Sequence, residues 1–127
     1  MANNVIITKK ARENMVKARA GVITLPKIVG MAFGDGGVDS SGNVVAPTAD
    51  QEALKHELKR KVLESYSFPA DTTCQYLCIL AENDLAGEDI SEIGLYDENG
   101  DIACIKTFKS KGKDADIQMT FTLDDVF

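Results

Sequence analysis

The chain has 127 residues, of which 44% are hydrophobic, and its 14 Lys and Arg against 20 Asp and Glu give a net charge of -6. This apolar content, with only three prolines, excludes a disordered chain and predicts one packed domain over residues 1–127. No apolar run reaches the roughly 18 residues that a membrane helix needs, and the first bases follow the first apolar stretch. We therefore expect no membrane span or signal peptide, and folding in a cytoplasm.

The charges are unevenly distributed along the chain. Residues 1–30 carry six bases and one acid, whereas residues 61–127 carry five bases and fourteen acids. A basic end and an acidic end are compatible with head-to-tail contact with a partner or a second copy, although solvated faces explain the charge alone more simply. Nucleic-acid binding is not expected, because the chain is acidic and its N-terminal bases have no aromatic neighbours for base stacking.

A capped helix from Lys9 to Ala20 is the first predicted element. Thr8 is a suitable N-cap residue and Gly21 a suitable C-terminal stop. Small side chains at i, i+4 and i+7 form the face expected to pack on a sheet: Ala11, Met15 and Ala18. The rest of the helix surface is basic: Lys10, Arg12, Lys17 and Arg19.

A strand, a long loop and a second helix are predicted next. Val22–Phe33 is apolar and β-branched, and the glycine-rich stretch from Gly34 to Pro47 is a loop of the length that tends to be mobile or functional. Thr48 and Gln51 fit a capping box, which predicts a helix that ends near Lys61. Its buried face has a four-residue spacing: Leu54, Leu58 and Val62.

Beyond the second helix the sequence predicts antiparallel strands. Val62–Phe68 alternates with period two, and Thr72–Ala81 returns after a turn. Tyr76–Leu80 is apolar on both faces, which predicts a central strand covered by a helix on one side and by another element or subunit on the other. Lys109–Asp114 is read as a flexible turn before a final strand, Ile117–Leu123.

A hairpin centred on Asn99 and Gly100 is the clearest local signal. Such a pair accepts the positive φ angles of a type I′ turn, which would place Leu95 opposite Cys104 and Tyr96 opposite Ala103. In that register one face is formed by Ile93, Leu95, Cys104 and Ile102. The predicted fold class is α+β, with an N-terminal helix and a second short helix packed on an antiparallel β meander.

No residue pattern predicts catalysis, a cofactor or a metal. His56 is read as a surface helix histidine without a catalytic partner. Gly34–Gly37 lacks the Gly-Lys-Ser/Thr of a phosphate-binding loop, so nucleotide binding is not favoured. Turn chemistry is preferred over calcium for two acidic sets: Asp35, Asp39 and Asp50, and Asp97, Asn99 and Asp101. The three cysteines are expected to be free, buried thiols: Cys74, Cys78 and Cys104.

Several segments in order resemble the phage tail-collar fibre family. They are Ile7-Thr8-Lys9-Lys10-Ala11-Arg12-Glu13, Met31-Ala32-Phe33-Gly34-Asp35-Gly36, Pro47-Thr48 with Gln51-Glu52-Ala53-Leu54, Ile90-Ser91-Glu92-Ile93-Gly94-Leu95-Tyr96-Asp97, and Gly100-Asp101-Ile102-Ala103. The resemblance implies the N-terminal domain of a tail fibre, which attaches a trimeric fibre to the baseplate of a phage or a phage-derived contractile particle (tailocin). It implies a structural, non-enzymatic protein of the virion or tailocin particle, assembled in the bacterial host cytoplasm.

The implied partners are baseplate proteins, a tail fibre and further copies of the chain, with a trimer expected. Family members usually continue into a shaft and a tip, so we expect an adaptor subunit or a fibre that has lost host recognition. The expected assembly surfaces are the loop with Gly34, Asp35 and Gly36, the hairpin with Asn99 and Gly100, and the basic helix facing an acidic neighbour. The alternative is a small cytoplasmic ligand-binding domain or enzyme that uses residues 34–47 as a lid.

Overall fold

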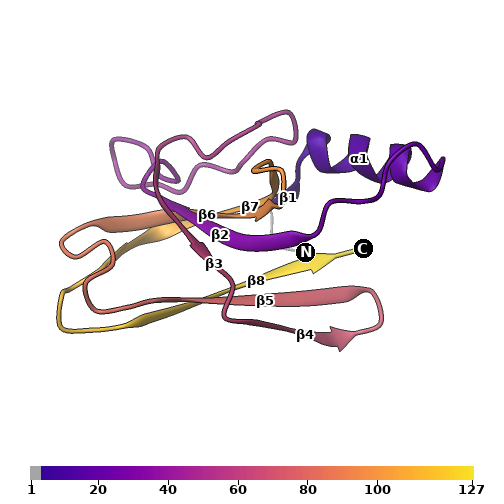
Figure 1. Cartoon of the computed structure of the whole chain (residues 1–127). Coiled ribbons are helices and arrows are strands. Elements are labelled where there is room, and N and C mark those ends of the chain that lie inside the picture. The colour runs from indigo at the N-terminus through magenta and orange to yellow at the C-terminus, as the bar shows by residue number, and fades with distance from the viewer. Residues whose placement is uncertain (1–3) are drawn as a thin grey trace.

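Two antiparallel β-sheets packed face to face form the body of the protein, and the computed structural model describes residues 4–127 (Figure 1). The larger sheet has the strand order β1-β7-β6-β2-β3, and the smaller has the order β4-β5-β8. In chain order the elements are β1 (Val5–Ile7), α1 (Lys9–Arg19), β2 (Ile28–Gly34), β3 (Glu57–Val62), β4 (Ser65–Ala70), β5 (Thr73–Leu80), β6 (Asp89–Asp97), β7 (Ile102–Gly112) and β8 (Met119–Val126).

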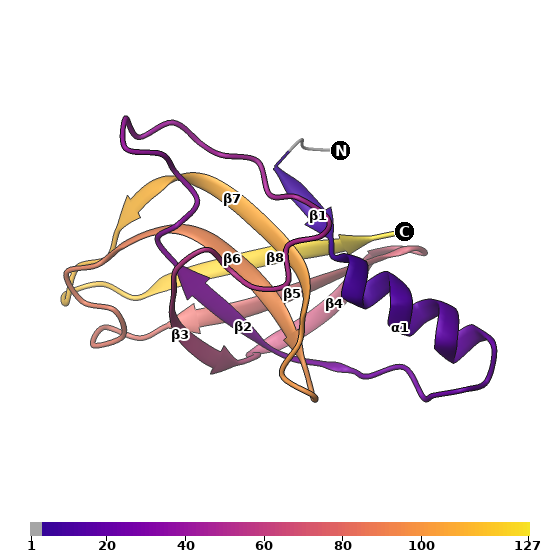
Figure 2. The same cartoon turned by 90° about the horizontal axis from the view of Figure 1, so that it is seen from above.

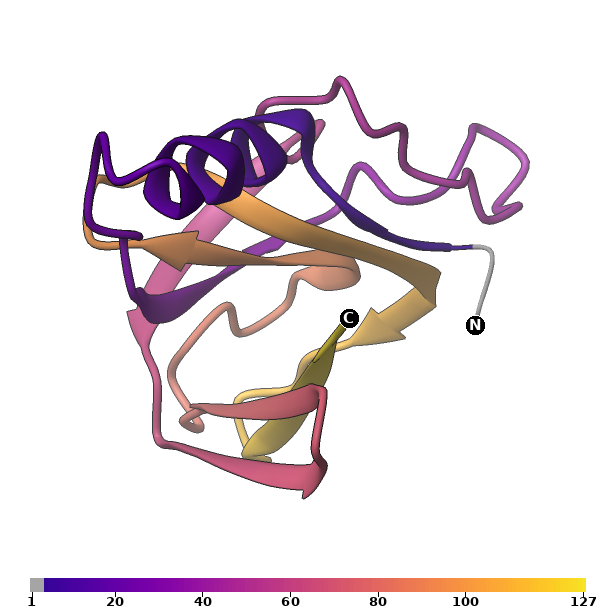
Figure 3. The same cartoon turned by 90° about the vertical axis from the view of Figure 1, so that its right-hand side faces the viewer.

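The main core lies between the two sheets. Phe33 of the large sheet meets Phe121 of the small sheet edge to face, with ring centroids 5.2 Å apart. Fully or almost fully buried side chains from both sheets surround this pair: Met31, Ile93, Leu95, Cys78, Leu80 and Leu123. A smaller cluster, which includes Leu54, lies on the outer face of the large sheet, where residues 35–56 pass over it (Figure 2). Figure 3 shows the two sheets from the side, with β4 and β5 on the side of the molecule opposite α1.

The predicted α+β fold with two helices packed on a meander is wrong. Among the described residues α1 is the single helix, and the remaining regular structure is β. The predicted second helix is an irregular segment up to His56, followed by β3. The capping pair forms only a local turn, in which the Thr48 N–H donates to Gln51 Oε1 at 3.4 Å. The sequence signal for a helix start is therefore present, but the helix does not propagate.

A buried carboxylate explains why that helix does not form. Glu92, in β6, has no exposed surface. Its oxygens accept hydrogen bonds from the backbone N–H groups of Lys55 at 2.9 Å, His56 at 2.9 Å and Gly36 at 2.7 Å. Two of these N–H groups would have to donate along the chain in a helix, and here they donate to a different element. Tertiary hydrogen bonds to a charged acceptor thus override the local helical preference.

The glycines near Glu92 let the backbone approach this carboxylate. A Cβ added at Gly34 would lie 2.4 Å from the carbonyl oxygen of His56, and one at Gly36 would lie 2.6 Å from Glu92 Oε2. A Cβ at Gly37 would lie 1.9 Å from the carbonyl oxygen of Ser91, whose hydroxyl accepts the Gly37 N–H at 2.9 Å. These glycines are required because a side chain at any of them would displace the backbone around Glu92.

The predicted single strand Val62–Phe68 is divided between the two sheets. The Leu63 N–H donates to Val29 O in the large sheet at 3.1 Å, and the next N–H, of Glu64, donates to Leu77 O in the small sheet at 2.9 Å. The chain therefore changes sheets at this point. β5 lies at the centre of the small sheet and is covered on one face by the large sheet, rather than by a helix as predicted.

The predicted hairpin forms, but its turn is different. Only Gly100 of the turn pair has a positive φ, +87°, and the Asp97 N–H donates to Asp101 O at 2.9 Å. Leu95 lies opposite Cys104 as predicted, while Tyr96 lies opposite Ile102 because of a register shift. Ile102 consequently points to the outer cluster, away from Leu95.

The predicted turn Lys109–Asp114 is also wrong, because β7 continues to Gly112.

The N-terminal helix is confirmed. Thr8 Oγ1 accepts the Ala11 N–H at 3.1 Å and donates to Ile102 O at 2.8 Å, so that one hydroxyl caps α1 and fixes it to β7. Gly21, with φ +82°, follows the C-terminal end. The bounds of β2 and β8 differ from the predicted strands, since β2 begins only at Ile28 and β8 runs from Met119 to Val126.

Replacing Glu92 by Gln tests the importance of the buried carboxylate. An amide retains one acceptor oxygen and turns an NH₂ group toward a backbone N–H, so we expect Glu92→Gln to lower the free energy of unfolding by about 3 kcal/mol. Urea denaturation followed by circular dichroism measures the change. Glu88→Gln, at an exposed side chain, is the control and should change stability little. Equal stability of both variants and the parent would contradict this assignment.

Candidate assembly groove

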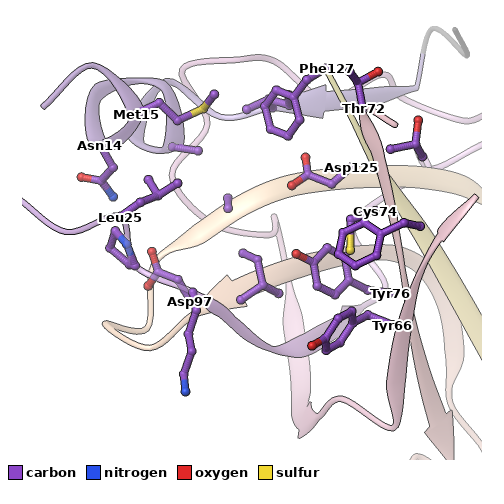
Figure 4. Close-up of a pocket in the computed structure, with 18 of the residues that line it drawn as sticks. Asn14, Met15, Leu25, Tyr66, Thr72, Cys74, Tyr76, Asp97, Asp125 and Phe127 are labelled. Atoms are coloured by element: carbon purple, nitrogen blue, oxygen red, sulfur yellow. The ribbon is translucent and has the colours of Figure 1, made fainter. Parts of the chain in front are cut away.

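An open groove of about 690 Å³ lies between α1 and the small sheet (Figure 4). α1 contributes Ala11, Asn14 and Met15 to one wall. The opposite wall is mainly aromatic, with Tyr66 from β4 and Tyr76 from β5. The remaining principal lining residues are Leu25, Pro26, Lys27, Phe68, Cys74, Asp97, Asp125 and Phe127. The groove therefore joins segments from the beginning, middle and end of the chain.

The aromatic wall is largely uncovered. Tyr66 is 63% exposed, Phe68 69% and Phe127 60%. Every residue of β4 is exposed. The rings of Tyr66 and Phe68 meet edge to face at 5.8 Å, and Tyr66 lies 6.3 Å from Tyr76, so that the aromatic side chains form one patch. Clustered exposed rings of this kind are typical of protein contact sites, because their burial against a partner is favourable.

Asp125 places a carboxylate inside this groove. Figure 4 shows its side chain directed between Phe127 and Tyr76. Burial raises the pKa of the Asp125 carboxyl above its ordinary value. Among residues 4–127, no hydrogen bond or ion pair is formed by this carboxylate. Its neighbour Asp124 is exposed on the other face of β8 and accepts a hydrogen bond from Gln75 Nε2 at 2.9 Å.

None of the predicted assembly residues lines the groove itself, but the predicted helix surface and the predicted hairpin both border it. The four predicted bases of α1, namely Lys10, Arg12, Lys17 and Arg19, are exposed on the helix whose other residues form one wall. The hairpin tip adjoins the groove, because Asp97 and Lys27 line it and the Glu98 N–H donates to Lys27 O at 3.0 Å. Arg60 fixes the tip through a hydrogen bond of 2.8 Å from Nη1 to Gly100 O.

The predicted surface at Gly34, Asp35 and Gly36 lies at the other end of β2. Ile28 lines the groove, and Gly34 is six residues further along the same strand, a distance of about 20 Å in extended chain. Asp35 is paired there with His56, whose Nδ1 lies 2.5 Å from Asp35 Oδ1. The Asp35 carboxylate accepts a hydrogen bond from the protonated ring and thereby raises the pKa of His56. His56 is exposed as predicted, but it precedes a strand and is not in a helix.

One carboxylate of each predicted acidic set, Asp39 and Asp97, accepts hydrogen bonds within a turn, whereas Asp35 of the first set pairs with His56. Asp39 Oδ1 accepts the N–H groups of Ser41 and Asn43, each at 2.9 Å, and the hydrogen bond from Asn43 is the main cause of the lowered pKa of Asp39. Asp97 Oδ1 likewise accepts the N–H groups of Asn99 at 2.9 Å and Asp101 at 3.1 Å. These carboxylates are already satisfied by the backbone, which accounts for their positions.

All three cysteines are free thiols, as predicted. Cys78 and Cys104 are buried in the core, and burial raises the pKa of Cys104 to about 12. Cys74 is only partly buried and lines the groove. In the described part of the chain, no cluster of His, Cys, Asp or Glu has the arrangement of a metal site.

Sequence reasoning missed the groove. Tyr66 and Phe68 alternate with Ser65 and Ser67, and this pattern was the available signal for an exposed aromatic edge. Asp125, beside Asp124 at the end of a strand, carried no comparable signal. Only the change of sheets after Leu63 places the aromatic strand opposite α1.

Replacement of Asp125 by Asn tests whether its burial costs stability. A carboxyl whose pKa is raised by folding makes the native state bind more protons than the unfolded state. Stability therefore falls as pH rises from the unfolded pKa to the folded pKa, and stays lower above it. We expect Asp125→Asn to stabilise the fold by about 1 kcal/mol at neutral pH and to have less effect in acid. Thermal unfolding at several pH values, with Asp124→Asn as control, measures this; a destabilised Asp125→Asn would contradict it.

Residues 4–127 contain no helix with the length and apolar character to cross a membrane, since α1 has only 11 residues. No curated protein and no solved structure matches the chain. The family described as phage tail-collar fibre protein, N-terminal, matches residues 1–122. This match covers almost all of the chain and includes α1, the strands β1 to β7 and the first part of β8. The chain therefore belongs to the phage tail-collar fibre family and has a structural role in a phage tail fibre.

Proposed function

We propose that this domain attaches a tail fibre to the baseplate of a phage or of a phage-derived contractile particle (tailocin), and that the groove beside α1 is the docking surface. Membership of the tail-fibre family supports the structural part of this proposal. The observation that carries the attachment role is the exposed aromatic wall, in which Tyr66 and Phe68 lie on a wholly exposed strand. Burial of these rings against a partner would supply a favourable apolar contact.

The basic face of α1 is the second part of the proposed surface. Its bases and the groove-lining residues are on the same helix. An acidic neighbour, either a baseplate protein or a further copy of this chain in a trimer, would be attracted to this face and oriented by it. Apolar contacts in the groove would then provide most of the binding energy, and the charges would provide orientation.

No observation favours the alternative of an enzyme or ligand-binding domain with residues 34–47 as its lid. These residues contribute to the lining of neither the groove nor a second cavity, of about 610 Å³, beside β1 and β8. Instead, the loop is held on the outer face of the large sheet by hydrogen bonds to Glu92 and Ser91.

A double substitution in β4 tests the docking role of the groove. We expect Tyr66→Ser with Phe68→Ser to fold normally, because both side chains are mostly exposed, and to reduce incorporation into particles at least about tenfold by removing apolar contact area. Incorporation is measured by quantitative immunoblotting of purified particles. Val62→Ser, at a side chain that is 74% exposed but outside the groove, is the matched control. Normal incorporation of the folded double variant would refute docking through the groove.

Charge reversal on α1 tests the electrostatic part. We expect the variant with Lys10, Arg12, Lys17 and Arg19 replaced by Glu to assemble poorly, and assembly of the parent to weaken as salt is raised, because exposed charges are screened. Circular dichroism confirms the fold, and incorporation is measured at low and high salt. If the folded variant assembles as well as the parent under both conditions, electrostatic docking is wrong and the apolar groove alone must carry attachment.

A further inference from the structure

We infer that the groove receives a positively charged side chain, arginine or lysine, from an extended segment of the partner protein, with Asp125 as counter-charge and the rings of Tyr66 and Tyr76 as an aromatic wall. This inference rests on the proposed function, since it specifies the chemistry of the partner that docks in the groove. It concerns one carboxylate and two rings, and can therefore be tested separately from attachment itself.

The first support is the balance of charge in the groove. Three carboxylates line it, those of Asp71, Asp97 and Asp125, against one amine, that of Lys27. Asp97 is occupied by the backbone of its own turn, whereas Asp125 has no partner among residues 4–127. A partly buried carboxylate without a partner loses solvation and gains nothing in return, and a cation placed beside it would offset that cost. An anionic segment would increase the cost.

The second support is the nature of the wall beside Asp125. Asp125 of β8 lies opposite Cys74 of β5, and Tyr76 is two residues further along β5. The ring and the carboxylate therefore belong to adjacent strands of one sheet. A guanidinium or ammonium group is attracted to the face of an aromatic ring. The aliphatic stem of Arg or Lys packs on apolar surface while its charged end reaches a polar group. A side chain of this type therefore satisfies both the rings and the carboxylate, which a purely apolar residue does not.

The third support is the open shape of the site. The groove is bounded by β4, whose residues are all exposed, and by α1. A polypeptide can therefore lie along it, with one side chain directed inward and apolar neighbours resting on Phe68 and Phe127, which are themselves mostly exposed. Since attachment requires a protein partner, we assign the cation to an extended segment of that partner.

Titration with a matched pair of peptides tests the inference. The ¹⁵N-labelled chain is titrated with acetyl-Leu-Arg-Leu-amide and with the same peptide carrying citrulline, which retains the shape of arginine without its charge. We expect the arginine peptide to shift the amide resonances of Tyr66, Cys74 and Asp125 and to bind about tenfold more tightly than the citrulline peptide. Asp125→Asn should remove this difference, and Asp124→Asn should preserve it.

Three outcomes would overturn the inference. They are equal affinity for the two peptides, a difference that persists in Asp125→Asn, and shifts confined to other acidic regions. Sedimentation of the chain alone tests whether a second copy of this chain occupies the groove. Self-association that is lost in Asp125→Asn would assign the cation to another copy of this chain and would refute a different partner. A further comparison separates this inference from the proposed function. If the Asp125→Asn variant is incorporated into particles normally but the Tyr66→Ser, Phe68→Ser variant is not, the inferred cation is refuted while docking through the groove stands.

Discussion

The hydrogen bonds accepted by the carboxylate of Glu92 hold the long segment between β2 and β3 in place, and the rest of this side of the large sheet depends on them. The carboxylate is fully buried, and it receives backbone N–H groups from Gly36, Lys55 and His56, which lie 36 to 56 residues away in sequence. One side chain of β6 thereby fixes both ends of the long segment between β2 and β3. Because a buried carboxylate is costly unless it is hydrogen-bonded, the donors and the glycines that admit them must occur together.

This arrangement gives a physical meaning to the sequence features of the family. The stretch Phe33-Gly34-Asp35-Gly36 and the stretch Glu92-Ile93-Gly94-Leu95 are remote in sequence but form the two sides of one hydrogen-bonded site. A Cβ at Gly94 would lie 3.2 Å from Leu54 Cδ2, so the same segment that reaches Glu92 also packs on this glycine. The close approach to Gly94 is therefore made by another segment of the chain itself.

The surface available to a partner arises from a second constraint, the change of sheets after Leu63. Once β4 joins the small sheet it lies at an edge, beyond the cover of the large sheet, and its aromatic side chains remain exposed. Asp125 lies on the inner face of the same small sheet and has no counter-charge among residues 4–127. The end of the molecule near α1 is thus less completely packed than its centre, which is the property expected of a surface that is completed by a partner.

The sequence by itself determined the elements whose signals are local. Thr8 and Gly21 delimit α1, and the pairing of Leu95 with Cys104 follows from alternation on both sides of a turn. It did not determine the segment before β3, where hydrogen bonds to Glu92 overrode a capping signal. It also did not determine the type of turn at Gly100, which places Ile102 on the outer face of the large sheet and not beside Leu95. Only the tertiary structure decided these, and with them the groove, because a buried carboxylate and a change of sheets act between residues that no local pattern connects.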